Sequence, residues 1–371
     1  MSRILILHAS VGTGHKTAAR ALARAFELRG AAQVWCEDAL DYGPSIYRQF
    51  YVNSYIELSE KAPVLWSYFY ERSDRDDTKL TKDLRTLMDR FGVAELDELV
   101  DRCRPDAIVC THFLPVNMLG REKRKGRLPQ PLYCIVTDYN GHVFWVNSYA
   151  DRYFVASPKA AFMLAQRGVH PSIISVTGIP IDPAIAEPKD REITQHKHHI
   201  ARSPVVTLMG GGIDVDTMRQ MTVGLIEEMG EGSLMVVAGR NEELEAALRD
   251  LHGTPKVDLR VLGFVDYLDD LVAASDLVVT KAGGLIVSEV MARHTPMVVV
   301  EPIPGQEEWN ADHIVCAGAG LQVRLPEMVP LLVHNLLADP ARLQALREGA
   351  QREGQPRAAF TVAEQILHEI S

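Results

Sequence analysis

Short apolar runs alternate with helical stretches along most of this chain. Residues 3–7 form an apolar run typical of a buried parallel strand, and the stretch from Gly12 to Gly14 separates it from an alanine-rich helical segment, residues 15–29. Gly30 ends that helix, and residues 33–36 form the next strand. A strand, a glycine loop, a helix and a second strand in this order predict the opening of a doubly wound α/β domain.

The alternation of expected strands and helices continues along the chain, apart from one aromatic-rich segment and one polar segment. A segment rich in aromatic residues, 42–73, interrupts the first half, and the polar residues 186–204 separate the halves as a linker. Because strands that alternate with helices indicate a parallel sheet, we expect an α/β protein with two Rossmann-like domains facing a cleft, at residues 1–188 and 200–350. Residues 351–371 would add a C-terminal helix that could pack back on the first domain. The further runs expected to be strands lie at residues 107–110, 132–136, 152–155, 175–180, 205–209, 234–238, 257–262, 277–279 and 297–300.

Composition and charge exclude some classes of function. With 371 residues, 47% of them apolar and a net charge of −10, the chain is typical of a globular protein and not of a general nucleic-acid binder. Five scattered cysteines without a CxxC pair favour reduced thiols and a cytoplasmic location. The chain opens with a strand, with no signal peptide, and no apolar stretch approaches the ~20 residues of a membrane span, so any membrane contact would be peripheral.

Two charged stretches each allow two interpretations. Residues 121–127 are strongly basic, which suits either a solvated loop or a contact with phosphate or an anionic membrane surface. His196, His198 and His199 lie in the expected linker, where they could bind a metal ion but more often mark a solvated segment. We therefore predict no metal site.

The residues richest in binding chemistry lie between Thr280 and Asn310. A helix with Glu289 one turn in follows the first of two strands, and the second strand leads to Gln306, Glu307 and Asn310. Glycines at a helix N-terminus let backbone N–H groups approach an anion closely, an acid one turn further can bind a ribose diol, and the last three side chains can hold sugar hydroxyls. Together these features indicate a nucleotide-sugar site. The residues at the start of that helix are Lys281, Ala282, Gly283 and Gly284.

The first glycine loop carries a histidine. His15 stands where a P-loop needs a glycine, and Thr17 stands where a dinucleotide fingerprint needs its third glycine, although acids after the second strand keep the dinucleotide alternative open. A helix N-terminus lowers the pKa of a histidine on its first turn. A neutral His15 could act as a general base or donate to an anion, or it could merely cap the loop formed by Gly12, Thr13 and Gly14.

Three other places follow expected strands. Asp138 and His142 come after the strand at 132–136, where Asp138 could orient a base, accept a proton or simply form a turn. A second anion-ready loop, followed by Asp214 or Asp216 as a helix cap, consists of Gly210, Gly211 and Gly212. The loop at Phe264 could read a base edge through its backbone, or Phe264 could be an ordinary packed side chain.

These motifs together resemble one known family. The segments SVGTGHKTAARAL, VTDYNGHVFWV, TLMGGGI, LGFVDYLDDLVAASDLVVTKAGGLIVSEVMA and EPIPGQEEWNADHI are similar to those of the monogalactosyldiacylglycerol synthase and processive diacylglycerol glucosyltransferase family, in the expected order from Ile4 to about Gly320. The resemblance implies the GT-B fold, with the acceptor in the N-terminal domain and the donor in the C-terminal one. It implies an inverting transfer of galactose or glucose from a UDP-sugar to diacylglycerol, with no tightly bound cofactor or metal.

The resemblance also implies a role for each motif. Uracil would be read near Phe264, the diphosphate would lie at 210–212 and 282–284, and Glu289 would bind the ribose. His15 would activate the acceptor, with help from Asp138. Gln306, Glu307 and Asn310 would hold the sugar, and the acceptor side would include Gly12, Thr13, Gly14, His142 and Trp145.

The aromatic segment then suggests where a lipid is reached. Aromatic residues favour a membrane interface, although an aromatic stripe at helical spacing is more often core. The candidate membrane contacts are Tyr47, Tyr51, Tyr55, Trp66, Tyr68 and Phe69. We expect a protein at the inner face of the cell membrane whose partners are a UDP-sugar, diacylglycerol and an anionic lipid surface. Alternatives are a polyprenyl-linked or other hydrophobic acceptor, or a UDP-sugar epimerase or hydrolase of the same architecture.

Overall fold

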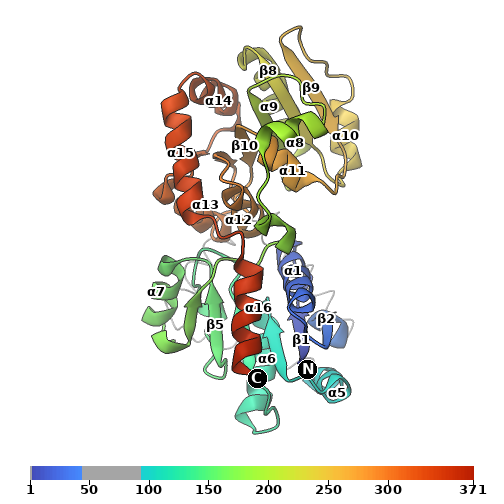
Figure 1. The fold of residues 1–371 in the computed structure, drawn as a ribbon, viewed down its shortest axis with the longest axis vertical. Helices are drawn as coiled ribbons and strands as arrows, with labels where there is room; N and C mark the ends of the chain where they lie inside the picture. The colour runs from blue at the N-terminus through green and yellow to red at the C-terminus, as the bar shows by residue number, and fades with distance from the viewer. Residues whose placement is uncertain (1, 44–92) are drawn as a thin grey trace. The chain divides into compact units, whose positions relative to one another are not determined.

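A computed structural model describes residues 2–43 and 93–371, and these form two compact units. The first unit contains Met1–Ala184, Ile303–Trp309 and Arg357–Ser371, and the second contains Ile185–Pro302 and Asn310–Pro356. Each unit is an α/β layer structure in which helices flank one sheet (Figure 1). The expected membrane contacts between Tyr47 and Phe69 lie outside the described residues.

The first unit is built on a six-stranded sheet in which neighbouring strands are parallel. The strand order is β2-β1-β3-β4-β5-β6, so the chain crosses from one side of β1 to the other between β2 and β3. This reversal creates a switch point between β1 and β3, where open α/β sheets bind ligands at the carboxyl ends of their strands. The strands are β1 (Arg3–His8), β2 (Gln33–Asp38), β3 (Ala107–Cys110), β4 (Leu132–Ile135), β5 (Arg152–Val155) and β6 (Ile174–Val176).

The helices of the first unit include one from the far end of the chain. Helix α16 (Ala358–Glu369) packs beside α1 (Gly14–Leu28), so the C-terminal helix belongs to this unit (Figure 1). Arg29 joins the two helices, because its Nε donates to Glu364 at 2.7 Å and its guanidinium lies 4.0 Å from the ring centre of Phe360. The other helices among the described residues of this unit are α5 (Val93–Cys103), α6 (Phe113–Arg124) and α7 (Pro158–Gln166), with short 3-10 turns at Ala39–Tyr42, Val143–Trp145 and Pro171–Ile173.

The second unit repeats the architecture with a different strand order. Its six parallel strands lie in the order β12-β11-β10-β7-β8-β9, which is the nucleotide-binding Rossmann order, with its switch point between β7 and β10. The strands are β7 (Val205–Met209), β8 (Gly232–Val237), β9 (Val257–Leu262), β10 (Leu277–Thr280), β11 (Met297–Val300) and β12 (Gly320–Val323). The helices are α8 (Arg191–Lys197), α9 (Val215–Glu228), α10 (Glu242–Leu248), α11 (Leu268–Ala274), α12 (Gly284–Ala292), α14 (Val329–Leu337) and α15 (Pro340–Glu353), with a 3-10 turn at Pro326–Met328. Helix α13 (Gln306–Ala317) begins in the first unit and continues in the second from Asn310, and the 3-10 turn Pro183–Ala186 also spans the boundary between the units.

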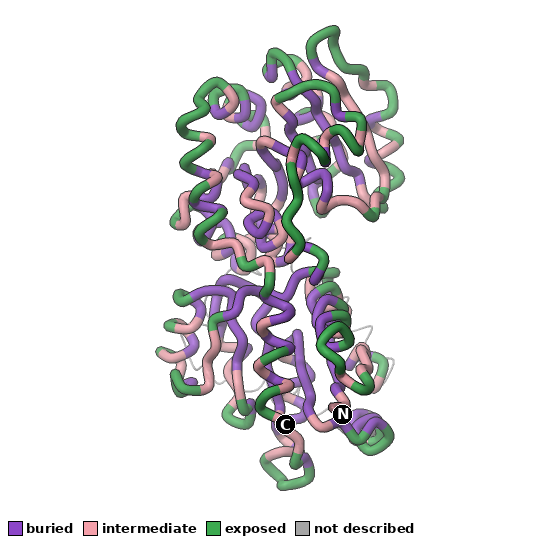
Figure 2. The backbone as a smooth tube through the Cα atoms, viewed as in Figure 1, coloured by how far each residue is buried: buried purple, intermediate pink, exposed green. Residues whose placement is uncertain are grey.

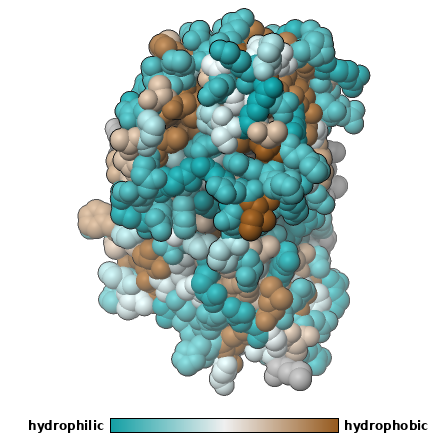
Figure 3. All heavy atoms as spheres, turned by 45° about the horizontal axis from the view of Figure 1, so that its top comes forward, coloured by the Kyte–Doolittle hydropathy of each residue, from teal (hydrophilic) through white to brown (hydrophobic). Residues whose placement is uncertain are grey.

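The apolar runs of the sequence are the buried centres of both sheets. Every residue of β3, β4, β7, β10 and β11 is buried, which explains why these strands read as continuous apolar runs and not as alternating ones (Figure 2). On the face drawn in Figure 3, hydrophilic residues predominate and apolar residues lie in small separate groups. Among residues 2–43 and 93–371, no helix combines the length and the apolar character that crossing a bilayer requires.

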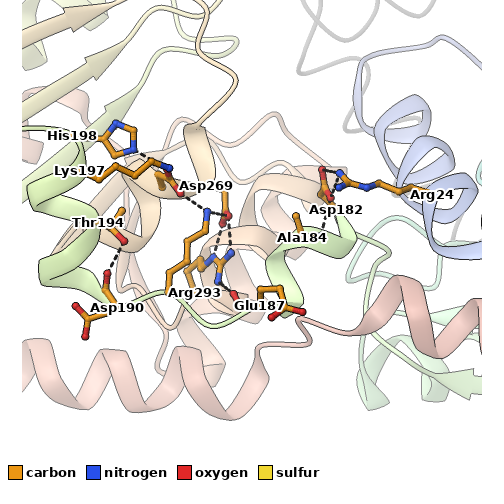
Figure 4. Close-up of polar contacts among 12 residues, drawn as sticks. Arg24, Asp182, Ala184, Glu187, Asp190, Thr194, Lys197, His198, Asp269 and Arg293 are labelled. Atoms are coloured by element: carbon orange, nitrogen blue, oxygen red, sulfur yellow. Dashed lines mark hydrogen bonds and ion pairs between the residues drawn. The ribbon is translucent and has the colours of Figure 1, made fainter. Parts of the chain in front are cut away.

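The expected linker is largely an ordered part of the second unit, so that expectation was wrong. Helix α8 packs against α11, and a network of charged side chains connects the two (Figure 4). Asp270, which is 6% exposed, accepts hydrogen bonds from Lys189, Lys197 and His198. The polar residues of this segment pair with acids on the folded unit, which a pattern of polarity alone does not distinguish from solvation.

Candidate functional site

The histidine of the first glycine loop lies at the switch point of the first sheet. Helix α1 begins at Gly14, directly after the loop that follows β1, and His15 is on its first turn. Gly12 has a φ of +78°, a left-handed conformation that glycine adopts without steric cost. Thr111, the first residue after β3, contacts His15 from the neighbouring strand. The switch point therefore contains the residue that the sequence predicts as a general base.

Hydrogen bonds define the tautomer of His15. Its Nδ1 lies 2.8 Å from the carbonyl oxygen of Thr111, which can only accept, so Nδ1 carries the proton. The hydroxyl oxygen of Thr137 lies 2.9 Å from the same nitrogen. The other ring nitrogen, Nε2, consequently has the free lone pair of a neutral imidazole. This is the arrangement that a general base requires.

Burial keeps this imidazole neutral. Desolvation lowers the pKa of His15 to about 4, and the hydrogen bond to the Thr111 carbonyl opposes this shift in part. The sequence predicted the direction of the shift but attributed it to the helix N-terminus, whereas desolvation is the largest cause in the structure. The two groups that contact Nδ1 are a carbonyl and a hydroxyl, and neither is an acid that would raise the pKa. His15 therefore stays unprotonated at neutral pH.

Two other histidines, which sequence reasoning missed, are also buried at the carboxyl ends of strands in the first sheet. The ring of His112 lies 4.4 Å from that of His15 in an edge-to-face arrangement, and burial lowers the pKa of His112 as well. His8 ends β1, is 4% exposed, and has its pKa lowered chiefly by burial. Both residues, like Thr111, stand at or just after the carboxyl end of a strand, which is the sequence signal that would have found them.

The loop after β4 supplies the other expected acceptor-side residues. Asp138, His142 and Trp145 are all buried, with exposures of 4%, 1% and 3%. The ring of Trp145 lies 6.2 Å from that of His15, and Nδ1 of His142 accepts a hydrogen bond from the backbone of Phe144. The fold therefore brings Trp145 to His15, while this contact of His142 stabilises the loop itself.

Asp138 is paired with a residue that the sequence assigned to the sugar. The side-chain amide of Gln306 donates to Asp138 Oδ1 at 2.7 Å, and both residues belong to the first unit. Glu307 accepts a hydrogen bond from the backbone N–H of Ile303 at 2.8 Å. These contacts order the turn before α13, so the start of that helix is held in place by its own acids and by Asp138.

In the second unit, the two glycine loops follow neighbouring strands at the switch point. Gly210 to Gly212 follow β7, and residues 281–284 follow β10, which pairs with β7. A Cβ at Gly210 would lie 2.5 Å from the end of the Leu244 side chain, so a larger residue there would displace that side chain. A Cβ at Gly212 would lie 3.6 Å from Cδ of Lys281, so the lysine side chain passes beside the first loop. The two loops expected at a diphosphate are thus adjacent in the fold.

Helix α12 begins within this region without a side-chain cap. Gly283 is its N-cap and makes no capping hydrogen bond through a side chain, whereas α9 is capped by Asp214, whose carboxylate accepts from Thr217 at 2.9 Å. Glu289 lies on α12 and is half-buried. An uncapped helix N-terminus next to a glycine loop and a lysine suits an anion.

Asn310 has a different place from the one expected. Its side chain is fully buried, and its amide nitrogen donates to the carbonyl of Ala282 at 2.9 Å within the second unit. In this conformation it positions the loop at residues 281–284, while Gln306 and Glu307 are half-buried at the start of α13. Gln306, Glu307 and Asn310 are close in sequence, so the sequence predicted one shared role. The packing of α13 places Asn310 on the buried face of the helix.

Phe264 is not an ordinary packed side chain. Its ring is 63% exposed, and the guanidinium of Arg240 lies 4.6 Å from the ring centre. An exposed aromatic ring covered by a cation offers a flat surface on which a base can stack. Arg240 was missed by the sequence reasoning.

The basic stretch at 121–127 is largely paired internally. Glu122 is 1% exposed and makes ion pairs with Lys125 and Arg127, while Lys123 pairs with Asp151 at 2.8 Å. Residues 121–124 are the end of α6, and residues 125–127 form the turn that follows it. Within residues 2–43 and 93–371, no group of three or more His, Cys, Asp or Glu side chains is arranged to hold a metal ion.

Comparison with known proteins decides the family. Residues 15–181 match the model described as monogalactosyldiacylglycerol (MGDG) synthase, and residues 205–361 match the model of the glycosyltransferase family 28 C-terminal domain. The chain belongs to the family of monogalactosyldiacylglycerol synthases and processive diacylglycerol glucosyltransferases. As a member of that family it is a glycosyltransferase, and its two units have the GT-B fold.

Individual relatives agree with this family over the full length. The chain is 27% identical to the processive diacylglycerol beta-glucosyltransferase of Bacillus pumilus, covering 99% of this chain and 95% of the relative. Its fold is similar to that of MurG from Acinetobacter baumannii, with a TM-score of 0.64 and 17% identity over 99% of this chain and 100% of the other. It is also similar to a UDP-GlcNAc 2-epimerase from Neisseria meningitidis bound to UDP-GlcNAc, with a TM-score of 0.62 and 12% identity over 98% and 99% of the two chains.

Proposed function

We propose that this glycosyltransferase moves a hexose from a UDP-sugar to the hydroxyl of 1,2-diacylglycerol, with inversion at the anomeric carbon. The first unit would bind the acceptor and the second the donor. The observation that carries the proposal is His15, which is held as a neutral imidazole with Nε2 unprotonated at a ligand-binding switch point. The relative from Bacillus pumilus, matched over nearly its whole length, supports diacylglycerol as the acceptor.

The proposed chemistry uses the lone pair that the fold leaves on His15. Nε2 takes the proton of the acceptor hydroxyl as the acceptor oxygen attacks the anomeric carbon. The bond from that carbon to the diphosphate breaks on the opposite face, so the configuration inverts and UDP leaves with the electron pair. Negative charge then develops on the diphosphate, where backbone N–H groups at the start of α12 and the side chain of Lys281 can stabilise it.

The donor would lie across the switch point of the second sheet. We propose that Gly210 to Gly212 and residues 282–284 bind the diphosphate, that Glu289 accepts hydrogen bonds from the ribose, and that uracil stacks near Phe264 and Arg240. Gln306 and Glu307 would bind the sugar hydroxyls, and Asn310 would hold the loop at Ala282. No tightly bound cofactor is needed for this reaction.

Glucose and galactose differ in one hydroxyl, and the amide and acid at positions 306 and 307 suit either sugar. The Bacillus pumilus relative is a glucosyltransferase by name, which favours glucose, and the family matched by the N-terminal half is named for monogalactosyldiacylglycerol synthase, which favours galactose. We propose UDP-glucose as the better donor, because that relative matches the chain as a whole. Since diacylglycerol resides in membranes, we also propose that the protein associates peripherally with the inner face of the cell membrane.

The deciding experiment is a product analysis. The protein is incubated with UDP-glucose or UDP-galactose and with diacylglycerol in anionic or neutral liposomes, and lipids are identified by mass spectrometry. A monohexosyldiacylglycerol that disappears in the His15→Ala variant supports the proposal. A product formed only with polyprenyl-linked acceptors, or no lipid product at all from the wild type, would exclude it.

The neighbour from Neisseria meningitidis shows why the same reaction mixtures need a second readout. That protein has a similar fold and is named an epimerase, so architecture alone does not separate a transferase from an epimerase. Chromatography of the nucleotide-sugars without lipid present detects epimerised UDP-sugar or free hexose. Either product at a rate equal to that of transfer would favour the epimerase or hydrolase alternative.

A further inference from the structure

Two threonines contact the ring nitrogen that does not take the proton. Thr111 follows β3 and Thr137 follows β4, and both are buried. The Thr111 carbonyl lies 2.8 Å from His15 Nδ1, and the Thr137 hydroxyl lies 2.9 Å from the same atom. Thr111 also donates its own hydroxyl to the backbone carbonyl of His15 at 2.9 Å.

The chemistry of these three groups allows one pattern of protons. If Nδ1 were unprotonated, its lone pair would face the lone pairs of the Thr111 carbonyl at 2.8 Å, which is repulsive. Nδ1 must therefore donate, and the Thr137 oxygen accepts from the same N–H in a three-centre bond. The two oxygens thus surround a single N–H.

This pair of acceptors takes a place often filled by a carboxylate behind a catalytic histidine. When Nε2 accepts a proton, the ring becomes positively charged and its Nδ1–H becomes a stronger donor. Both oxygen dipoles then stabilise the charge, more strongly in the transition state than before it. Loss of one acceptor should therefore reduce the rate of the chemical step more than it weakens substrate binding.

We propose that Thr137 is a positioning residue for His15: its hydroxyl oxygen shares the Nδ1–H with the Thr111 carbonyl and so keeps the Nε2 lone pair available to the acceptor. This inference rests on the proposed function of His15 as the base. The role belongs to the oxygen atom of the side chain and not to its volume. It can therefore be tested by a change that removes the oxygen and keeps the shape.

The variants are Thr137→Val, which replaces the hydroxyl with a methyl group, and Thr137→Ser, which keeps it. Thr177→Val is the matched control, because Thr177 is also a buried threonine after a strand of the same sheet, and its hydroxyl donates to Gly178. We expect kcat to fall about tenfold in Thr137→Val, as the loss of roughly one hydrogen bond implies, with KM for the UDP-sugar unchanged. Thr137→Ser should restore most of the rate, and Thr177→Val should resemble the wild type.

Nitrogen-15 NMR of the histidine side chains tests the tautomer without any activity. The His15 signals are assigned by their loss in His15→Gln, and wild type should show a protonated Nδ1 and an unprotonated Nε2. In Thr137→Val the Thr111 carbonyl still accepts from Nδ1, so we expect the same tautomer, with the Nδ1–H signal shifted by the loss of one acceptor. An unprotonated Nδ1 in the wild type, or an unchanged rate in a folded Thr137→Val variant, would overturn the proposal.

The two measurements separate this proposal from the proposed function. A wild type that makes no glycolipid but shows the expected Nδ1–H contradicts the function and leaves the hydrogen-bond assignment standing. A wild type that is active with His15 in the other tautomer contradicts the role of Thr137. Because the wild-type spectrum needs only His15→Gln for its assignment, the tautomer of His15 is decided even if Thr137→Val does not fold.

Discussion

His15 and Thr111, which are 96 positions apart in the chain, exchange two hydrogen bonds. The imidazole Nδ1 donates to the Thr111 carbonyl at 2.8 Å, and the Thr111 hydroxyl donates to the His15 carbonyl at 2.9 Å. This reciprocal contact fastens the first turn of α1 to the end of β3. The orientation of the ring therefore depends on the pairing of β1 with β3, and not on the glycine loop alone.

Removal of the His15 imidazole should abolish most of the transfer. A positioned general base contributes roughly a factor of 10² to 10⁴, so we expect kcat of His15→Ala to fall within that range while UDP binding is retained. Initial rates with diacylglycerol liposomes and calorimetric titration with UDP measure the two effects. His252→Ala, at an exposed histidine of the second unit, is the control and should remain active. Transfer by His15→Ala at the wild-type rate would show that another group is the base.

On the acid side of the pH profile, kcat/KM should begin to fall only at an unusually low pH. A base works when it is unprotonated, and burial lowers the pKa of His15 from the ordinary 6.5 to about 4. As the pH falls, His15 stays neutral until the pH approaches the lowered pKa, so kcat/KM should stay level below the value at which an ordinary histidine becomes protonated. Rates measured between pH 4 and 6.5, with circular dichroism at each pH to monitor folding, test whether the pKa of His15 is lowered. A midpoint at or above 6.5 in a folded protein would contradict it.

Glu289 should matter for the nucleotide and not for the fold. Removing a carboxylate that accepts from a ribose diol should cost about 2 kcal/mol, or a roughly 30-fold weaker affinity for UDP. Glu327→Ala, at an exposed acid of the same unit, should leave the affinity unchanged. Calorimetric titration compares the variants, and thermal unfolding checks that both remain folded. Full affinity in Glu289→Ala would remove this residue from the proposed ribose site.

The exposed ring of Phe264 should contribute to UDP affinity through stacking. Because the ring is 63% exposed, Phe264→Ala should hardly change the free energy of unfolding. Loss of a stacking surface shared with Arg240 should weaken UDP binding by about 1 kcal/mol, or roughly fivefold. Phe162→Ala is a matched control, since Phe162 is 64% exposed in the first unit. Equal UDP affinities for both variants and the wild type would argue against the base-stacking role.

The stability of the second unit should depend on Asp270. Burial alone would raise the pKa of this carboxyl, but hydrogen bonds from Lys189, Lys197 and His198 outweigh burial and lower it. A lowered pKa means that the stabilisation is present above the ordinary range of a carboxyl and is lost as the pH falls through the folded-state pKa. Asp270→Asn should therefore lower the free energy of unfolding by about 3 kcal/mol at neutral pH.

Denaturation by urea at several pH values measures this difference. The control is Asp250→Asn, which removes an exposed partner of Arg219 and should change stability little. The gap between wild type and Asp270→Asn should close as the solution becomes strongly acidic. A gap that is absent at neutral pH would mean that the charge network shown in Figure 4 does not stabilise the unit.

The sequence by itself determined the architecture and most of the candidate site. Fully buried parallel strands leave continuous apolar runs, and the polar or glycine-rich residues after each run must lie at the carboxyl edge of a sheet. This reasoning identified His15, the loops at 210–212 and 281–284, and Glu289, all of which lie at or directly beyond strand ends or on the helices that follow them. Local chemistry was sufficient because each motif is contiguous in the chain.

Tertiary structure decided what depends on residues far apart in sequence. It set the two strand orders, and with them the neighbours of each loop, because any strand can in principle pair with several others. It replaced the helix dipole by desolvation as the main reason that His15 is neutral, buried Asn310 against Ala282, and exposed Phe264 beside Arg240. It also turned a polar segment into α8, whose charges find partners on α11. Burial and pairing are properties of the packed chain, and a one-dimensional pattern does not contain them.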